Sequence, residues 1–373
     1  MKFSDVLDIR NGRNQRQVEN ANGKYPIYGS GGVMGRATDF ICDAGTVVIG
    51  RKGSINNPFF VDEPFWNVDT AFGLVAHRDV LLPKYLFYFC VNFDFEQLNT
   101  TVTIPSLTKA NLLQIEINVP DMDEQRYVVR VLDKICRLTD LQQQELHNLD
   151  QLVKSRFIEL FGDPERNPKK WPVVSITEII RGKVSNGFFA KRDAYRNDGN
   201  VQVLGVANIV NRMYSNIEGL PRTNATQAEK EKYRVKYGDM LFCRSSLVAE
   251  GIGKASIVPQ DTPQNVLFEC HVIRLPLDLQ KCVPEFVQAL STTPYFRKQI
   301  IAQSKTATMT TIGQDGILKA AIILPPVELQ QEFLRFVEQT DKSKYYSSLS
   351  FRYCQAAANT YRQEWMTCRT SDF

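Results

Sequence analysis

One long helical pattern occurs twice in this sequence, and it limits the folds that the 373 residues can adopt. After Pro120, apolar residues recur every three to five positions as far as Leu160, which is the spacing of one face of a helix. The pattern returns after Pro325, which lies 205 residues beyond Pro120, with apolar residues at Phe333, Phe336, Tyr346, Phe351, Cys354, Ala358 and Trp365. A narrow apolar stripe on so long a helix favours a helical partner. We therefore predict that the two helices pair as an antiparallel coiled coil.

The segments that precede the two helices also share a common plan. Apolar runs bounded by glycines predict strands in both segments, and residues 45–51 match residues 238–244. Gly162 and the prolines Pro164, Pro168 and Pro172 predict the end of the first helix and a stiff linker. We therefore expect an α+β chain with pseudo-two-fold symmetry. It would contain strand-rich globular domains at residues 1–118 and 163–324, each followed by a long helix, at residues 119–162 and 325–373.

Cysteine usage, histidine content and charge narrow the classes of function. The eight cysteines stand singly without a CxxC pair, and only three histidines occur, so we expect reduced thiols and no structural metal. Residues 163–324 contain 22 Lys and Arg against 15 Asp and Glu, whereas no other segment has an excess of basic residues. Such an excess fits a polyanionic partner, although many soluble basic proteins share it.

The predicted geometry suggests a partner more directly than the charge does. Two related heads on paired helices would act as a ruler, and duplex DNA presents pseudo-symmetric grooves at fixed spacing along a polyanionic backbone. The N-terminus begins an amphipathic globular pattern, and no apolar run approaches membrane-spanning length. We therefore expect a cytoplasmic protein that binds double-stranded DNA and has no membrane partner.

Several short motifs strengthen this interpretation because they occur in a fixed order. They lie at residues 45–51 and 238–244, at residues 104–107 before the first helix, at residues 120–126 and 325–331, and at the Phe-Gly-Asp-Pro sequence of residues 161–164. In this order the set resembles the specificity (S) subunits of type I restriction-modification systems over essentially the whole chain. The resemblance implies that each globular domain is a target-recognition domain for one half of a bipartite DNA site, and that the helices set the gap.

The same resemblance implies partners and a division of labour. Two modification (methyltransferase) subunits would dock on this chain and methylate adenine with S-adenosylmethionine. Restriction subunits, held through them, would cleave DNA with ATP and Mg²⁺. This chain would then be a non-catalytic specificity subunit, with no catalytic residue and no cofactor of its own.

Two motifs superficially suggest enzymes. Residues 45–52 are similar to a phosphate-binding loop, but Arg51 stands where lysine should follow the second glycine, and the interior is apolar. Residues 56–59 lack the second proline of an adenine methyltransferase motif. Two alternatives to the DNA-recognition hypothesis stay open from the residues alone. One is a coiled-coil adaptor whose two heads bind protein, and the other is a self-contained methyltransferase or nuclease.

Cations and hydroxyl groups in the predicted loops are the candidate DNA contacts, because these groups bind phosphates and base edges. In the first head they are Arg36, Arg51, Lys52, Thr101 and Thr103. In the second head they are Lys191, Arg192, Arg244, Lys254, Lys305, Thr308 and Thr310. We further expect His271 on a strand inside the second core, and Cys243 as a packed thiol rather than a nucleophile.

Overall fold

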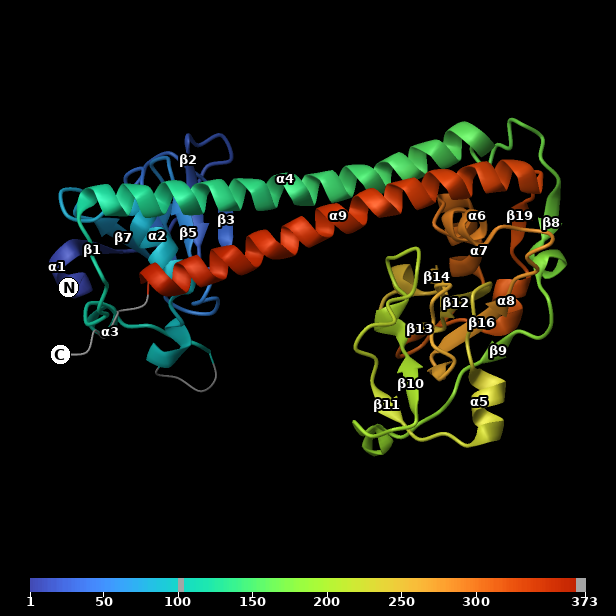
Figure 1. The fold of residues 1–373 in the computed structure, drawn as a ribbon. Helices are drawn as coiled ribbons and strands as arrows, with labels where there is room; N and C mark the ends of the chain where they lie inside the picture. The colour runs from blue at the N-terminus through green and yellow to red at the C-terminus, as the bar shows by residue number, and fades with distance from the viewer. Residues whose placement is uncertain (100–103, 367–373) are drawn as a thin grey trace. The chain divides into compact units, whose positions relative to one another are not determined.

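The computed structural model of the protein describes residues 1–99 and 104–366. The chain divides into two compact units, one formed by residues 1–145 with residues 346–373 and the other by residues 146–345. Each unit contains one globular head together with part of both long helices, α4 (Met122–Phe161) and α9 (Val327–Met366) (Figure 1). A unit therefore draws on chain segments that are far apart in the sequence.

The first head is built on an antiparallel sheet in the order β1-β7-β4-β5, beside a smaller sheet in the order β3-β2-β6. The central strand β4 is buried along its whole length, as its apolar run predicts for a strand covered on both faces. Helix α2 contributes Tyr85 and Phe89 to the core, where they lie with Phe3 and Phe72. The elements are α1 (Phe3–Val6), β1 (Leu7–Asn11), β2 (Tyr25–Gly29), β3 (Gly32–Ala37), β4 (Thr46–Gly50), β5 (Phe59–Val61), β6 (Trp66–Asn67), β7 (Ala71–Ala76), α2 (Pro83–Asn92), the 3-10 helix η1 (Phe95–Leu98) and α3 (Lys109–Leu112).

The second head repeats the buried central strand and adds further sheets. Strand β12 lies in the order β14-β12-β16-β9, beside the sheets β11-β10-β15, β13-β18-β17 and β19-β8. Its strands are β8 (Val173–Ser175), β9 (Ser185–Asn186), β10 (Val201–Leu204), β11 (Arg222–Thr223), β12 (Asp239–Cys243), β13 (Ser245–Ser246), β14 (Ala255–Ile257), β15 (Val266–Phe268), β16 (Val272–Pro276), β17 (Lys305–Thr306), β18 (Thr310–Thr311) and β19 (Ala321–Ile323). Its helices are α5 (Gln227–Tyr233), α6 (Pro284–Ser291), α7 (Pro294–Ala302), α8 (Gln314–Leu318) and the 3-10 helices η2 (Ile176–Ile179), η3 (Arg192–Ala194), η4 (Val206–Asn208) and η5 (Ala249–Gly251).

The two predicted long helices are α4 (Met122–Phe161) and α9 (Val327–Met366), each of 40 residues. The Asp121 carboxylate accepts the N–H groups of Asp123 and Glu124 at 3.0 and 2.9 Å, which satisfies donors that a helix start leaves unpaired. At the other end, Gly162 adopts a φ of +78° and donates its N–H to the Ile158 carbonyl at 2.8 Å. Glycine adopts this left-handed conformation without strain, so it ends α4 as the sequence predicts.

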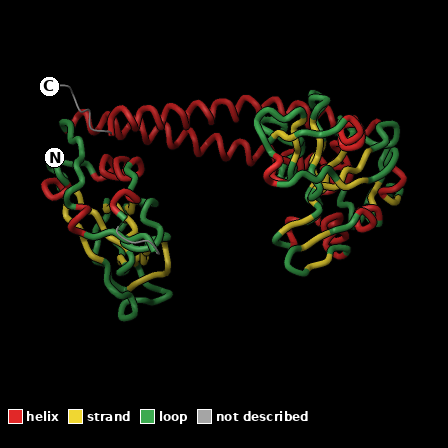
Figure 2. Tube along the Cα trace, turned by 90° about the horizontal axis from the view of Figure 1, so that it is seen from below, coloured by secondary structure: helices red, strands yellow, loops and turns green. Residues whose placement is uncertain are grey.

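Within each unit α4 and α9 lie side by side and run antiparallel (Figures 1 and 2). In the second unit, Arg156 on α4 forms an ion pair with Glu332 on α9 at 2.6 Å. In the first unit, the Ser347 hydroxyl on α9 donates to the Glu145 carboxylate on α4 at 3.0 Å. The predicted α+β fold, with two strand-rich heads and two long helices that pack together, is thereby confirmed.

Each head is fixed to a long helix by a buried glutamine at the same position of the repeat. Gln125 accepts the N–H of Leu82, which precedes α2, at 2.8 Å and donates to the Val80 carbonyl at 2.8 Å. Gln330, 205 residues later, accepts the N–H of Val283, which precedes α6, at 2.9 Å. Both glutamines are 0% exposed. We name these two contact regions the first joint and the second joint.

Candidate nucleic-acid interface

The arginine that directly follows the central strand is placed in the same way in both heads. After β4, the Arg51 carbonyl accepts the N–H of Leu107 at 2.9 Å. After β12, the Arg244 carbonyl accepts the N–H of Ile312 at 3.0 Å. In each head, therefore, the loop that follows the central strand lies against the segment that leads towards the next long helix. These paired segments position most of the candidate DNA contacts.

In the first head, Arg51 and Lys52 begin the loop after β4. The Arg51 guanidinium lies over the Phe72 ring at 5.6 Å from its centroid. Lys52 is exposed, and its backbone forms an isolated β-bridge with Ser106. The turn is completed by Gly53, which has a φ of +84° and donates its N–H to the Pro105 carbonyl at 3.0 Å. The two cations thus lie next to residues 105–107, at the end of the hydroxyl-rich sequence that runs from Thr100 to Thr108. Its candidate residues Thr101 and Thr103 lie outside the described residues.

Arg36 has a different setting on β3. Its guanidinium donates to the main-chain carbonyls of Gly23 and Lys24 at 2.6 and 2.7 Å. These bonds hold the preceding loop against the hairpin, a structural use that the sequence did not reveal. The tip of the same hairpin exposes Val33 and Met34, which are 62% and 61% accessible.

In the second head, Arg244 and Lys254 are half-buried and tied to neighbouring loops. The Arg244 guanidinium donates to the Cys270 carbonyl at 3.2 Å, and the Lys254 ammonium donates to the Asn211 side chain at 2.7 Å. Lys191 and Arg192 lie elsewhere, at the short 3-10 helix η3, and are exposed. The structure therefore groups Arg244 and Lys254 on one loop and does not join Lys191 and Arg192 to it.

The hairpin of β17 and β18 contains the last three candidates. Lys305 and Thr308 are exposed, whereas Thr310 is only 1% exposed and shares a hydrogen bond of 3.0 Å with the Thr306 hydroxyl. The side chain of Thr310 is thus turned into the head. The side chain of the next residue, Thr311, is exposed instead.

His271 shows a contact that sequence reasoning missed. It was expected inside the core, and this prediction is wrong, because His271 is exposed in the turn before β16. Its Nδ1 atom lies 2.7 Å from the Ser245 hydroxyl. A signal was present, since Glu269, Cys270 and His271 interrupt the apolar runs of β15 and β16. Leu247 and Val248 follow Ser246 in the loop after β13 and are 83% and 58% exposed.

The thiols have the environment of packed side chains. Burial raises the pKa of Cys42 and of Cys282 to about 12, and burial also raises the pKa of Cys243 beside Arg244. A thiol that stays protonated at neutral pH is a poor nucleophile. In the described ranges 1–99 and 104–366, no group of three or more His, Cys, Asp and Glu side chains could hold a metal ion. In the same ranges, no helix combines the length and apolarity needed to cross a membrane.

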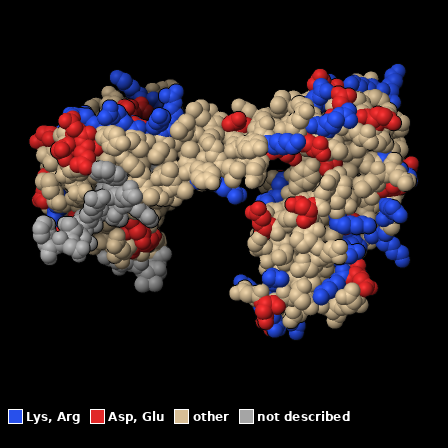
Figure 3. Space-filling model, viewed as in Figure 1, with Lys and Arg blue, Asp and Glu red and all other residues tan. Residues whose placement is uncertain are grey.

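Charge alone does not locate an interface on the second head. On the face shown in Figure 3, its Lys and Arg side chains are interspersed with Asp and Glu. The basic excess of residues 163–324 is thus spread over that face rather than gathered in one patch. Local geometry has to identify the contacting groups.

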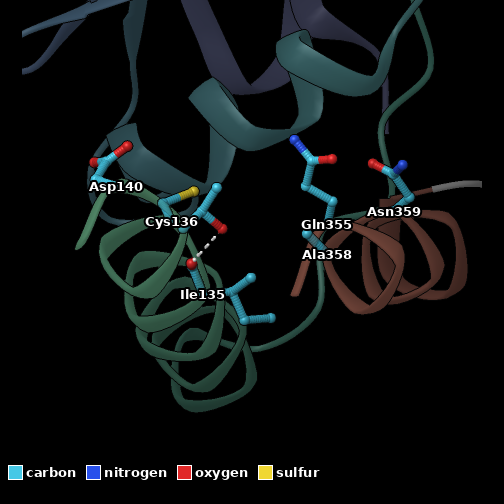
Figure 4. Close-up of a pocket in the computed structure, with 7 residues that line it drawn as sticks. Ile135, Cys136, Asp140, Gln355, Ala358 and Asn359 are labelled. Carbon is cyan, nitrogen blue, oxygen red and sulfur yellow. Dashed lines mark hydrogen bonds between the residues drawn. The ribbon is translucent and has the colours of Figure 1, made fainter. Parts of the chain in front are cut away.

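A groove of about 340 Å³ lies between α4 and α9 within the first unit. Figure 4 shows the side chains of Cys136, Asp140, Gln355 and Asn359 pointing to the same side of the two helices. Asp140 is the one charged residue among those that line the groove. The Thr139 hydroxyl donates a hydrogen bond to the Ile135 carbonyl at 2.9 Å. This lining offers no acid–base pair and no nucleophile with a base.

Comparison with known proteins identifies the repeated unit. The chain matches the family described as "Type I restriction modification DNA specificity domain" over residues 1–151 and 168–345. The chain belongs to this family. Its members among curated proteins include the EcoKI specificity subunit of Escherichia coli K12, which is 25% identical over 325 residues, 78% of this chain and 64% of that protein. Another is the MjaVIII specificity subunit of Methanocaldococcus jannaschii, which is 20% identical over 80% of this chain and 70% of that protein.

Solved structures share the fold of this specificity-domain protein. The S subunit of a type I restriction-modification system from M. genitalium aligns with a TM-score of 0.63 at 13% identity, covering 99% of this chain and 96% of that one. A chain from a study of complex assembly and conformational transition of the type I R-M system aligns with a TM-score of 0.55 at 14% identity, covering 98% and 96%. The chain spans 64% of the length of the EcoKI subunit. The resemblance drawn from the motifs is confirmed.

Proposed function

We propose that this chain recognises a bipartite sequence in duplex DNA as the specificity subunit of a type I restriction-modification assembly. Each head would read one half of the site, and the paired helices would set the spacing. The observation that supports this most strongly is that the DNA specificity family matches the chain twice, over residues 1–151 and 168–345, so that each match includes one head. The equivalent placement of Arg51 and Arg244 in the two heads agrees with two related readers.

The proposed contacts are those candidates whose side chains are exposed or half-buried and are not held by two main-chain carbonyls. Arg51 and Lys52 in the first head, and Arg244, Lys254, Lys191, Arg192, Lys305 and Thr308 in the second, would bind phosphates or base edges. Arg36 would chiefly hold its own loop, because two main-chain carbonyls already accept from its guanidinium. Thr310 would support the hairpin from inside, since its side chain is buried. Thr101 and Thr103 keep their proposed role from the sequence.

Methylation and cleavage would be the work of other subunits. We propose that two modification subunits dock on this chain and bring S-adenosylmethionine for adenine methylation, and that restriction subunits joined through them use ATP and Mg²⁺. The domain division at residues 118, 162 and 324 would then separate DNA-reading parts from spacing and docking parts. The assembly would act in the cytoplasm, and this chain would supply recognition without a catalytic centre. A coiled-coil adaptor with protein-binding heads is not favoured, because the family match is to a DNA specificity domain.

Salt dependence of DNA binding tests the proposal. The full chain, purified with any subunits that it retains, is titrated with labelled random-sequence duplexes at about 50 to 200 mM salt. Because phosphate contacts release counterions, we expect affinity to fall at least tenfold across this range. Absence of duplex binding would overturn the proposal. Separately, the chain alone with labelled S-adenosylmethionine and DNA should transfer no methyl groups, and transfer would favour the enzyme alternative.

A further inference from the structure

The short sheet of β13, β18 and β17 in the second head arranges side chains in two rows. Ser245 pairs with Thr311, which pairs with Lys305, and in the next row Ser246 pairs with Thr310, which pairs with Thr306. Residues directly opposite each other in antiparallel strands have their side chains on the same face, and neighbours along a strand face opposite ways. The sheet therefore has a Ser245–Thr311–Lys305 face and a Ser246–Thr310–Thr306 face.

The second of these faces is turned towards the head at Ser246 and Thr310, whereas Thr306, on the edge strand, is exposed. Thr310 is 1% exposed and bonded to Thr306, and the Ser246 hydroxyl is so close to Gly251 that a Cβ atom there would approach it to 2.1 Å. The first face points outwards. Lys305 and Thr311 are exposed, and the Ser245 hydroxyl meets His271 at 2.7 Å. We name the set His271, Ser245, Thr311 and Lys305 the outward row.

The outward row has the size and chemistry of a reader of base edges. Strands lie about 4.8 Å apart, so β17 and β18 form a two-stranded ribbon of the size that a major groove about 12 Å wide admits. The row offers hydroxyl groups, an imidazole and an ammonium, which can donate to or accept from bases. In the sequence, Arg244 directly precedes Ser245 of the row. Leu247, which follows Ser246 and is 83% exposed, is an apolar group suited to contact a thymine methyl.

We propose that the outward row enters the major groove of duplex DNA and reads the half-site recognised by the second head. This rests on the proposed function and adds to it the face, the groove and the residues. Thr311, Ser245 and His271 become specificity-determining residues in place of the buried Thr310. The occupant is DNA because the row contains an exposed cation, Lys305, and the segment 163–324 carries the chain's excess of basic residues.

Selection from a random-sequence duplex library tests the assignment. The full chain with its retained subunits is compared with Thr311→Val and Ser245→Ala, and the bound duplexes are sequenced. We expect discrimination at one or two base pairs of a single half-site to fall about tenfold, with the other half-site and the salt dependence unchanged. Thr306→Val, on the opposite face of the same sheet, is the matched control and should select the wild-type sequence.

A fold check and a rescue keep the result interpretable. Circular dichroism establishes that each variant is folded, and Thr311→Ser, which keeps the hydroxyl, should restore wild-type discrimination. Unchanged preference in both Thr311→Val and Ser245→Ala, or altered preference in Thr306→Val alone, would overturn the outward row as the reader. A wild-type protein that selects no sequence at all would instead overturn the proposed function, and the outward row with it.

Discussion

The first and second joints share one backbone arrangement and differ in their charges. In both, a fully buried glutamine on the long helix accepts the main-chain N–H that precedes a short helix of the head, α2 or α6. Around it, the first joint has a Lys84–Asp133 ion pair at 2.8 Å, and the Tyr88 hydroxyl donates to the same Asp133 at 2.6 Å. The first joint is thus balanced by opposite charges.

The second joint has two acids at the corresponding positions. Glu285 follows the first proline of α6 as Lys84 follows that of α2, and Glu338 lies 205 residues after Asp133. Glu285 is 1% exposed and accepts the hydroxyls of Tyr214 and Tyr237 at 3.0 and 3.2 Å. Burial raises the pKa of Glu285, and the Glu338 carboxylate raises it further. The comparison teaches that the two joints share the buried amide, whereas the charges around it differ in sign.

Removing the shared amide should have the largest effect. Gln125→Ala or Gln330→Ala leaves a buried N–H and at least one carbonyl without a partner, so we expect each unit to lose about 2–4 kcal/mol of stability. Hydrogen exchange at the amides of α2 and α6 reports the loss in the affected unit. The exposed residues Gln144→Ala and Gln339→Ala are the controls. A small effect in one joint only would show that the two joints do not share their anchor.

Raising the pH should weaken the second unit more than the first. Burial raises the pKa of Asp239 to about 6, and the pKa values of Glu285 and Asp341 are raised as well, mainly by burial. A carboxyl whose folded pKa lies above its unfolded value adds stability at low pH, and this is lost as the pH rises through the folded pKa. We expect about 1–3 kcal/mol to be lost from the second unit between about pH 4 and pH 7.

Glu285→Gln isolates the joint within that pH dependence. The neutral amide cannot ionise, so the variant should lose less stability than the wild type as the pH rises. Amide hydrogen-exchange rates, corrected for the intrinsic effect of pH on exchange, report the stability of the second unit in both proteins. Equal pH dependence in the two proteins would show that Glu285 is not a titrating group of the second joint.

Changing the charges of the first joint should have the smallest effect. Lys84→Glu gives the first joint two acids like the second, and we expect a loss of about 1 kcal/mol, because Lys84 and Asp133 are 44% and 39% exposed and solvent screens them. The exposed Lys134→Glu on α4, next to Asp133 in the sequence, controls for net charge. High salt should reduce the difference between the two variants.

The sequence predicted the long helices, their pairing and the two related heads, because periodicity and glycine and proline signals are local. It predicted less of the candidate site. Which of Thr310 and Thr311 faces outwards depends on strand register, and whether Arg36 is available depends on a loop that returns to it. His271 was misplaced because only residues 269–271 separate the two buried strands, and in the sequence so short a polar interruption resembles part of a strand. Such features depend on partners distant in sequence.

The central claim is that two heads read two half-sites whose spacing the paired helices set. The most direct test inserts seven residues into α4 between Gln142 and Glu145, with a matching heptad in α9 between Ser347 and Ser350, where these residues pair. Seven helical residues add about 10 Å, or about three base pairs. Sequencing of the DNA selected by the full assembly should show both half-sites unchanged and the gap about three base pairs longer. An unchanged gap would contradict the account.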